Sequence, residues 1–282
     1  MSDAPTPDPR ITLARPDLAR AELEGLVKAE RFAPAVLRRV TVPTAPIRKA
    51  ANAAAEQLDQ AIFGELFDVI ETAHGFAWGQ ARRDGYVGYV AEDALGALGE
   101  PATHWVSALR TYAFAEPSIR APSFGPLSLN ALVTVDGQEE GGFVHAAGAG
   151  WIARRHLRPV GETPTDFVEI AEQFLGAPYL WGGRDSLGLD CSGLIQQALY
   201  ACGHACPRDT DQQAALGREA PDAALVRGDL VFWKGHVGVM LDGARLLHAN
   251  AHHMAVAVEL LGEAIQRIDA AGVGQPTAYR RL

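Results

Sequence analysis

A cysteine in the C-terminal half of the chain has the surroundings of a catalytic nucleophile. Cys191 stands in Asp190-Cys191-Ser192-Gly193-Leu194, where a Gly-rich turn gives way to a segment with helical spacing. A thiol at the first turn of a helix faces unpaired N–H groups and the positive end of the helix dipole, and both favour the thiolate. The same N–H groups can stabilise the oxyanion of acyl transfer. Cys191 is therefore a candidate nucleophile, with a buried core cysteine as the alternative.

Two histidines downstream are candidates for the base and its orienting partner. A thiol nucleophile needs a base that later protonates the leaving amine, and histidine suits both steps. His236 opens the apolar run Val237–Met240, and His248 ends the next apolar run. Antiparallel strands joined at Asp242-Gly243 would bring the imidazoles together, so that His248 fixes the tautomer of His236. The alternatives are a solvated turn histidine at 236 and a structural histidine at 248, with Asn250 in the orienting place.

The elements that must position these residues divide the chain into four regions. Residues 36–100 and 101–160 each hold several short apolar segments separated by Gly and Pro, which predicts two small all-β barrels. Residues 161–282 hold two stretches of helical spacing followed by strand-like runs, which predicts an α+β domain. Residues 1–35 begin with a Pro-rich tail, followed by a predicted short helix. Its apolar face would be Leu18, Leu23, Leu26 and Val27.

Composition excludes several classes of protein. Lys and Arg total 25 against 34 Asp and Glu, and the resulting net charge of −9 argues against a nucleic-acid partner. Hydrophobic residues make up 48%, which is typical of a globular protein. The 3 cysteines rule out a disulfide framework and fit a reducing compartment. The sequence shows neither a secretory leader nor a run long enough to cross a membrane, so we expect a cytoplasmic protein without a membrane partner.

Two clusters invite a metal-site interpretation. Cys202, His204 and Cys206 lie close together, but no second pair of ligands is near in sequence. His252 and His253 follow His248 in a strand-rich region, without the helix and the intervening Glu of a typical zinc peptidase. We therefore expect neither a metal nor another cofactor.

Several motifs occur in the order found in one peptidase family. Residues 164–282 resemble the NlpC-type cysteine peptidases, a papain-like family that acts on bacterial cell-wall peptides. The resemblance implies a papain-like α+β fold with Cys191 as nucleophile, His236 as base and His248 as orienting residue. The matching motifs are Ala177-Pro178-Tyr179-Leu180-Trp181-Gly182-Gly183, Asp190-Cys191-Ser192-Gly193-Leu194, Arg208-Asp209-Thr210-Asp211-Gln212, Arg227-Gly228-Asp229-Leu230-Val231-Phe232, His236-Val237-Gly238-Val239 and His248-Ala249.

Residues 40–160 resemble the paired bacterial SH3-like barrels that precede this domain in one subgroup. That subgroup resembles γ-D-glutamyl-L-diamino-acid endopeptidases that require a free N-terminal L-Ala. The resemblance implies that Asp190 binds the free amine, a role compatible with capping the helix of Cys191. It also implies that Tyr86 reaches the site from the first barrel, with Tyr89 as a neighbour that could be confused with it. Glu65 would be a second amine ligand, or else an ordinary surface glutamate.

Three further residues complete the expected substrate-binding set. Thr210 stands where the subgroup usually has Ser, and with Gln213 it forms a Thr-x-x-Gln capping box that explains the residue equally well. Tyr179 would flank the nucleophile near the oxyanion, or pack the turn. Ser192 directly follows the nucleophile in the matching motif.

The predicted function is a cysteine endopeptidase that cleaves the γ-D-Glu–diamino acid bond of free murein peptides during cell-wall peptide recycling. The expected partner is this small peptide, and the sequence leaves the oligomeric state open. One alternative is an acyltransferase or amidase on another acyl substrate, because an amine can capture the thioester. Another is a non-catalytic module that binds cell-wall peptides.

Overall fold

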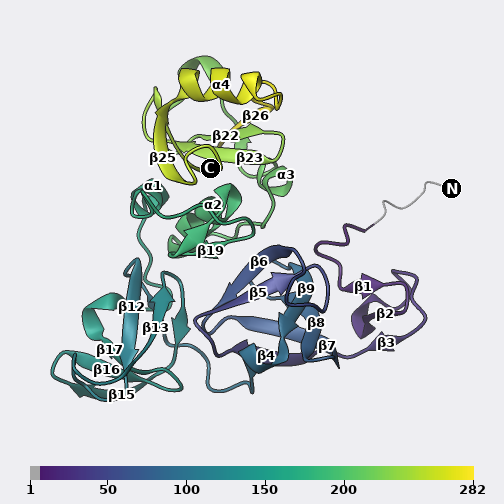
Figure 1. Cartoon of the computed structure of the whole chain (residues 1–282), viewed down its shortest axis with the longest axis vertical. Helices are drawn as coiled ribbons and strands as arrows, with labels where there is room; N and C mark the ends of the chain where they lie inside the picture. The colour runs from purple at the N-terminus through teal and green to yellow at the C-terminus, as the bar shows by residue number, and fades with distance from the viewer. Residues whose placement is uncertain (1–6) are drawn as a thin grey trace.

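The computed structural model describes residues 7–282, so the first part of the Pro-rich tail lies outside the described residues. The fold is mixed α+β, with strands in all regions and the longer helices in the C-terminal domain. Figure 1 shows the C-terminal domain above two all-β units, with a small N-terminal sheet beside the first of these. The fold class predicted from the sequence is confirmed.

The N-terminal region forms a small sheet instead of the predicted helix, and that prediction was wrong. Leu18 is fully buried and packs near Trp78 of the first barrel, whereas Leu26 is 75% exposed, so the predicted apolar face does not exist. Gly25 adopts a φ of 81°, which no helix accommodates. Only a single 3₁₀ turn, Ala21–Leu23, forms. The sheet contains β1 (Ala14–Arg15), β2 (Leu18–Arg20) and β3 (Phe32–Ala33).

The first barrel is a 7-stranded sheet in the order β10-β4-β7-β8-β9-β5-β6. Phe67 and Ile47 are fully buried in its core. Gly79 permits close strand packing, because a Cβ there would lie 2.1 Å from the carbonyl oxygen of Asp68. The strands are β4 (Val36–Val40), β5 (Thr44–Arg48), β6 (Gln57–Ile62), β7 (Leu66–Ala73), β8 (Phe76–Ala81), β9 (Val87–Ala91) and β10 (Leu95–Gly96).

The second all-β unit has a 3-stranded sheet, β14-β11-β18, and a 5-stranded sheet, β13-β12-β17-β16-β15. Val106, Leu127 and Ile152 are fully buried in the core of this unit. The strands are β11 (His104–Val106), β12 (Arg110–Phe114), β13 (Ser123–Ser128), β14 (Leu132–Val133), β15 (Val135–Glu140), β16 (Phe143–Ala146), β17 (Gly150–Ala153) and β18 (Leu157–Pro159). We keep 36–100, 101–160 and 161–282 as the proposed domain boundaries.

The C-terminal domain packs helices on both faces of a 6-stranded antiparallel sheet, β21-β26-β22-β23-β24-β25. The helices are α1 (Phe167–Glu172), α2 (Cys191–Ala201), the single turn α3 (Thr210–Gln213) and α4 (Leu261–Ala270). The strands are β19 (Arg184–Asp185), β20 (Gly188–Leu189), β21 (Arg218–Glu219), β22 (Leu230–Trp233), β23 (His236–Met240), β24 (Arg245–Asn250), β25 (Ala255–Leu260) and β26 (Ala278–Arg281). The predicted strand-like runs between 229 and 261 are therefore confirmed.

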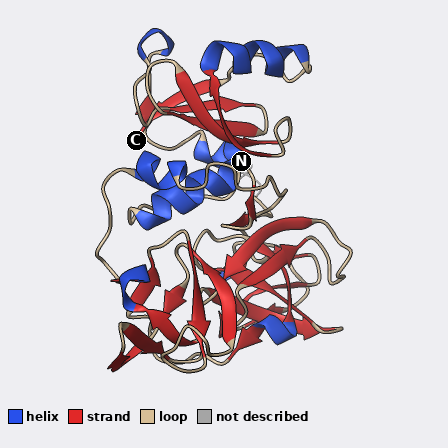
Figure 2. Ribbon diagram, turned by 60° about the vertical axis from the view of Figure 1, so that its left-hand side comes forward, coloured by secondary structure: helices blue, strands red, loops and turns tan. Residues whose placement is uncertain are grey.

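Helix α2 is the central element of the molecule. Figure 2 shows helices between the C-terminal sheet and the barrels, while α4 covers the opposite face of the sheet. Every residue of α2 is buried, and its apolar cluster includes Trp105 and Leu129 of the second all-β unit. The nucleophile candidate is thus placed at the junction of the domains. Within residues 7–282, no helix is both long enough and apolar enough to cross a bilayer.

The burial of α2 makes a prediction about stability. Ile195 is fully buried in the central cluster, so Ile195→Ala removes buried methyl groups and leaves a cavity. We expect a loss of about 2–5 kcal/mol in the free energy of unfolding, measured by urea denaturation. Leu26→Ala is the control, because this leucine is 75% exposed and should change stability by less than about 0.5 kcal/mol. Equal losses would contradict the central position of α2.

Candidate active site

Cys191 is the first residue of α2 and is almost completely buried, with 6% exposure. Asp190 is the N-cap, and its Oδ1 accepts a hydrogen bond from the backbone N–H of Gly193 at 2.8 Å. The sulfur lies 4.0 Å from the carbonyl oxygen of Gly235. Backbone N–H groups of Val237 and Ser192 also approach it. Gly235 and Val237 flank His236, so the turn into β23 borders the thiol.

Burial is the main cause of the pKa shifts of Cys191 and His236. It raises the pKa of the Cys191 thiol to about 12, with a further contribution from the Asp190 carboxylate, while the backbone donors oppose the shift. Burial also lowers the pKa of His236 to about 3, assisted by His248 and Arg267. Cys191 and His236 are therefore both neutral at pH 7. This differs from the thiolate expected from the helix dipole, because desolvation outweighs the dipole.

The predicted strand pair brings the two histidines together. His236 begins β23 and His248 lies on the adjacent β24. Nε2 of His236 lies 2.9 Å from Nδ1 of His248. His248 is completely buried, and its Nε2 lies 2.6 Å from Oε2 of Glu259 on β25. Arg267 of α4 in turn binds Glu259 through Nη2 at 2.5 Å and Nε at 3.1 Å.

A small cavity of about 170 Å³ opens beside Cys191. Four of the predicted substrate-binding residues line it, namely Tyr86, Asp190, Ser192 and Thr210. Its wall also includes Arg10, Asp209 and Asp211, to which the sequence interpretation gave no role. The cavity therefore combines contributions from the N-terminal segment, the first barrel and the C-terminal domain.

The wall opposite α2 is strongly acidic. Oδ2 of Asp209 accepts hydrogen bonds from Arg10 Nη1 at 2.9 Å and from the Tyr86 hydroxyl at 3.2 Å. Arg10 also binds both oxygens of Asp211 at 2.8 Å and the carboxylate of Asp8. Burial raises the pKa of Asp209, although Arg208 and Arg10 oppose the shift. In this wall two carboxylates, Asp209 and Asp211, share the single Arg10 guanidinium, which leaves the wall with a negative balance.

Asp190 lines the cavity, but its carboxylate is fully engaged elsewhere. Arg208 Nη1 donates to Oδ1 at 2.9 Å and Nη2 donates to Oδ2 at 2.5 Å. The backbone N–H of Gly182 donates to Oδ2 at 2.9 Å, and the Ser192 hydroxyl to Oδ1 at 3.2 Å. With the capping bond from Gly193, these donors leave little room for a ligand amine.

Glu65 lies outside the cavity, in a buried ion pair with Arg184. The two side chains form contacts of 3.1 Å and 2.6 Å, and both are almost completely inaccessible. Its predicted place as an amine ligand is therefore not what the structure shows, because the carboxylate faces the interface between the first barrel and the C-terminal domain. Tyr179 is half-buried near the thiol, and burial followed by the Cys191 charge raises its pKa.

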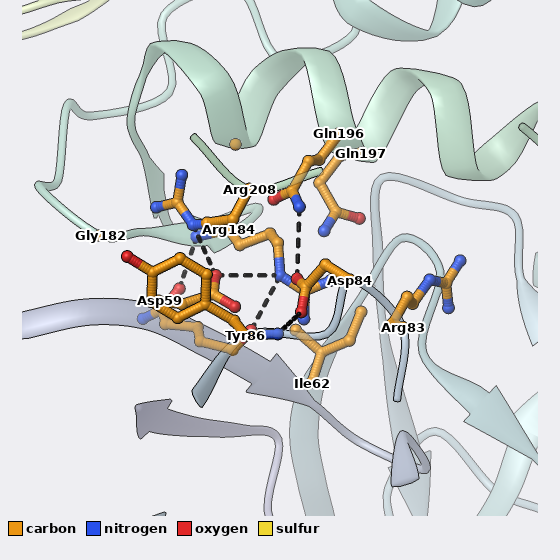
Figure 3. Close-up of polar contacts among 12 residues, drawn as sticks. Asp59, Ile62, Arg83, Asp84, Tyr86, Gly182, Arg184, Gln196, Gln197 and Arg208 are labelled. Atoms are coloured by element: carbon orange, nitrogen blue, oxygen red, sulfur yellow. Dashed lines mark hydrogen bonds and ion pairs between the residues drawn. The ribbon is translucent and has the colours of Figure 1, made fainter. Parts of the chain in front are cut away.

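Figure 3 shows part of the polar interface between the first barrel and the C-terminal domain, where Asp59 faces Arg184 and Arg208. Asp59 Oδ1 accepts from Arg208 Nε at 2.6 Å and lies 3.4 Å from Arg184 Nε. All three side chains are essentially inaccessible to water. Arg208 thus links the barrel to Asp190 and, through it, to the start of α2.

Some site residues had a sequence signal and others had none. Asp209 and Asp211 lie in the quoted motif Arg208-Asp209-Thr210-Asp211-Gln212, so the motif pointed to them without assigning a role. Arg10 lies in the Pro-rich start of the chain, where no pattern marks it. Among residues 7–282, no group of His, Cys, Asp and Glu has the arrangement of a metal site. Cys202 and Cys206 are buried, free thiols in the cluster around α2.

Comparisons with known proteins agree with this fold. Residues 176–269 match the NlpC/P60 family, and residues 47–95 match the bacterial dipeptidyl-peptidase Sh3 domain. The matched segment and the fold define a papain-like α+β domain in the C-terminal part of the chain. More particularly, the chain contains an NlpC/P60 domain behind a bacterial SH3 domain, as the sequence resemblance predicted.

The curated relatives each match about a third of this chain. A protein named gamma-D-glutamyl-L-lysine dipeptidyl-peptidase from Bacillus subtilis (strain 168) is 36% identical over 111 residues, which cover 36% of this chain and 38% of that protein. The peptidoglycan endopeptidase RipB of Mycobacterium tuberculosis is 32% identical over 120 residues, covering 36% of this chain and 48% of that protein. The matches thus span less than half the length of these relatives.

The whole arrangement also occurs in a solved structure. An NlpC/P60 family protein from Bacillus cereus ATCC 10987 aligns with a TM-score of 0.74 over 87% of this chain and 99% of that chain. The two are 18% identical, so this likeness concerns the fold. The order of barrels and catalytic domain is therefore shared.

The buried interface makes a prediction about Arg208. Arg208→Gln leaves the buried carboxylate of Asp190 without its cation and removes the nearer of the two cations that face Asp59, and we expect a loss of about 3–5 kcal/mol in the free energy of unfolding. Arg227→Gln is the matched control, because Arg227 is 40% exposed in its pairs with Asp166 and Glu172. Such surface pairs contribute about 0–1 kcal/mol. Similar urea midpoints for the two variants would refute the interface role of Arg208.

Proposed function

We propose that the protein is a cysteine peptidase that cleaves the γ-D-Glu–diamino acid bond of short, free cell-wall peptides with an unblocked N-terminal L-Ala. The observation that carries this proposal is the acidic wall of the small cavity beside Cys191, formed by Asp209 and Asp211. The largely buried Asp209 in this wall suits a substrate that ends in an ammonium group, because a desolvated cation needs a carboxylate partner.

Asp209 is the residue that we assign to the substrate amine, in place of Asp190. Arg10 and Tyr86 both hold Oδ2 of Asp209, and in the described part of the chain no hydrogen bond engages its Oδ1. Oδ1 is therefore the acceptor available to a ligand. The carboxylate of Asp190, by contrast, is saturated by Arg208 and backbone donors. Asp190 then acts as the cap that positions Cys191.

The amine requirement determines which peptides can react. An N-acylated peptide brings a neutral amide to Asp209, so the half-buried carboxylate loses its charged partner. Peptide stems still joined to glycan through the L-Ala nitrogen are excluded in the same way. The enzyme would therefore act on released peptides, as expected for recycling. The name of the Bacillus subtilis relative, gamma-D-glutamyl-L-lysine dipeptidyl-peptidase, supports the bond that we assign.

The reaction begins from a neutral thiol and a neutral imidazole. As the Cys191 sulfur attacks the γ-carbonyl carbon, its proton passes to His236, and N–H groups at the start of α2 stabilise the oxyanion. Nε2 of His236 is engaged by His248, which leaves Nδ1 to exchange protons with Cys191. His236 then protonates the leaving amine of the diamino acid. Water then attacks the thioester and gives a proton to His236, the Cys191 thiolate leaves and takes this proton back, and L-Ala-D-Glu is released.

The remaining predicted residues take supporting roles in this proposal. The Tyr86 hydroxyl holds Oδ2 of Asp209 and so directs Oδ1 to the cavity. Ser192 and Thr210 line the cavity between the nucleophile and the acidic wall. Tyr179 packs close to the thiol.

The direct test is a mass-spectrometric digest of L-Ala-γ-D-Glu-meso-diaminopimelate and of its N-acetylated form. We expect the full-length protein to release L-Ala-D-Glu from the free peptide only, and Cys191→Ala to release none. Cleavage of both peptides would keep the peptidase and remove the amine requirement. Cleavage of neither would favour a different acyl substrate, a transferase or a binding module.

The role of Asp209 has its own prediction. Asp209→Asn removes the charge that pairs with the substrate ammonium, so kcat/KM for the free peptide should fall about 10- to 100-fold, the equivalent of one charge-assisted hydrogen bond. The effect should fall mainly on KM. Asp242→Asn, in an exposed turn away from the cavity, is the control and should leave both constants unchanged. An unchanged preference for free over N-acetylated peptide in Asp209→Asn would exclude this assignment.

A further inference from the structure

Glu259 stands at the far end of the histidine pair and has no role in the reaction described above. We propose that it is a positioning residue that fixes the protons of His248 and His236, so that Nδ1 of His236 keeps its lone pair for Cys191. This inference deepens the proposed function and rests on it, because it concerns the base of the same reaction.

The contacts form one continuous chain across three strands and a helix. His236 Nε2 lies 2.9 Å from His248 Nδ1, and His248 Nε2 lies 2.6 Å from Glu259 Oε2. Arg267 closes the chain with contacts of 2.5 Å to Oε2 and 3.1 Å to Oε1 of Glu259. Each ring nitrogen along the pair, apart from His236 Nδ1, therefore has an identified partner.

The charge of Glu259 sets the direction of the protons. Burial pushes the pKa of Glu259 upward, but Arg267 and His248 outweigh it, so the pKa is lowered and the group is a carboxylate. A carboxylate only accepts hydrogen bonds, so Nε2 of His248 must carry a proton. Burial lowers the pKa of His248 to about 4, against the opposing effect of Glu259, so the ring holds no second proton at pH 7. Its Nδ1 is then an acceptor.

The position of the proton on His248 determines which nitrogen of His236 is protonated. Because His248 Nδ1 accepts, Nε2 of His236 must donate, and a neutral His236 keeps its lone pair on Nδ1. In the reverse arrangement, the unprotonated Nε2 of His248 would face the Glu259 carboxylate at 2.6 Å. His236 would then carry its proton on Nδ1 and could not take one from Cys191. The carboxylate therefore selects the reactive tautomer.

The surrounding charges indicate that Glu259 acts mainly by orienting the proton of His248, and less through the effect of its negative charge on the pKa of His236. Arg267 from α4 pairs directly with Glu259, so the two charges largely cancel at the distance of His236. Arg267 and His253 both disfavour a proton charge on His248, and Glu259 opposes them. His248 itself is inaccessible to water, so no solvent molecule on its surface can replace the carboxylate as acceptor.

The test is histidine ¹⁵N NMR of the full-length protein, which reports the protonated nitrogen of each ring without any substrate. In the wild type we expect protons on Nε2 of both His236 and His248. In Glu259→Ala, His248 should lose its preference for the Nε2 proton, and His236 should show a mixture of tautomers. Glu263→Gln, on the exposed side of α4, is the matched control and should keep the wild-type pattern.

Kinetics on the free peptide supply the second readout. We expect Glu259→Ala to lower kcat about 10- to 100-fold with little change in KM, as for other groups that orient a reacting residue. Glu259→Gln should recover part of the loss, because its amide oxygen can accept the same proton. A wild-type His236 protonated on Nδ1, or a kcat for Glu259→Ala within twofold of wild type, would overturn the proposal. If the wild type cleaves no peptide, the proposed function fails, and the NMR result still decides the role of Glu259.

Discussion

The arrangement of the whole site depends on one buried guanidinium. Arg208 donates through Nε to Asp59 of the first barrel at 2.6 Å, and through its terminal nitrogens to Asp190 and Ser192 of the catalytic domain. Asp190 caps α2, so the guanidinium holds the helix start, and with it Cys191, against the barrel. A lysine could not replace it, because a single ammonium cannot address two carboxylates and a hydroxyl in this planar arrangement.

This geometry separates Asp190 from Asp209, two of the three carboxylates that line the cavity. Asp190 is held by Arg208 and caps the helix, while Asp209, the next residue after Arg208, lines the cavity and is held through Oδ2 by Arg10 and Tyr86. Two adjacent residues therefore have different tasks: Arg208 binds Asp190, and Asp209 lines the cavity. Buried ion pairs add little net stability by themselves. Here the pairs of Arg184 and Arg208 with carboxylates of the first barrel fix the position of the barrel against the C-terminal domain.

Local patterns explain which parts of the site were predictable from the sequence. The helix beginning at Cys191 and the strand pair carrying His236 and His248 follow from short-range spacing and turn residues, and the structure has both. The family motifs then supplied the fold class. The N-terminal helix failed because Leu18 is buried by Trp78, a contact between distant parts of the chain.

The features that could not be predicted from the sequence depend on contacts between residues that are far apart in the chain. The partner of Asp190 is Arg208, and nothing in local spacing distinguishes Asp190 from Asp209 as the free carboxylate. Glu65 looked like a surface residue or a ligand, but Arg184 from the other domain covers it. Glu259 reaches His248 only through the register of β24 with β25, which a single sequence does not reveal.

The shared construction of the cavity limits how this catalytic domain can be reused in evolution. A gene fragment for residues 161–282 alone would expose Arg184 and Arg208 without Asp59 and Glu65, and would lack the cavity walls formed by Arg10 and Tyr86. In a fusion to an unrelated domain, new carboxylates would have to replace Asp59 and Glu65 as partners of Arg184 and Arg208. Within this chain, the barrel and the C-terminal domain therefore complete each other's buried charge pairs.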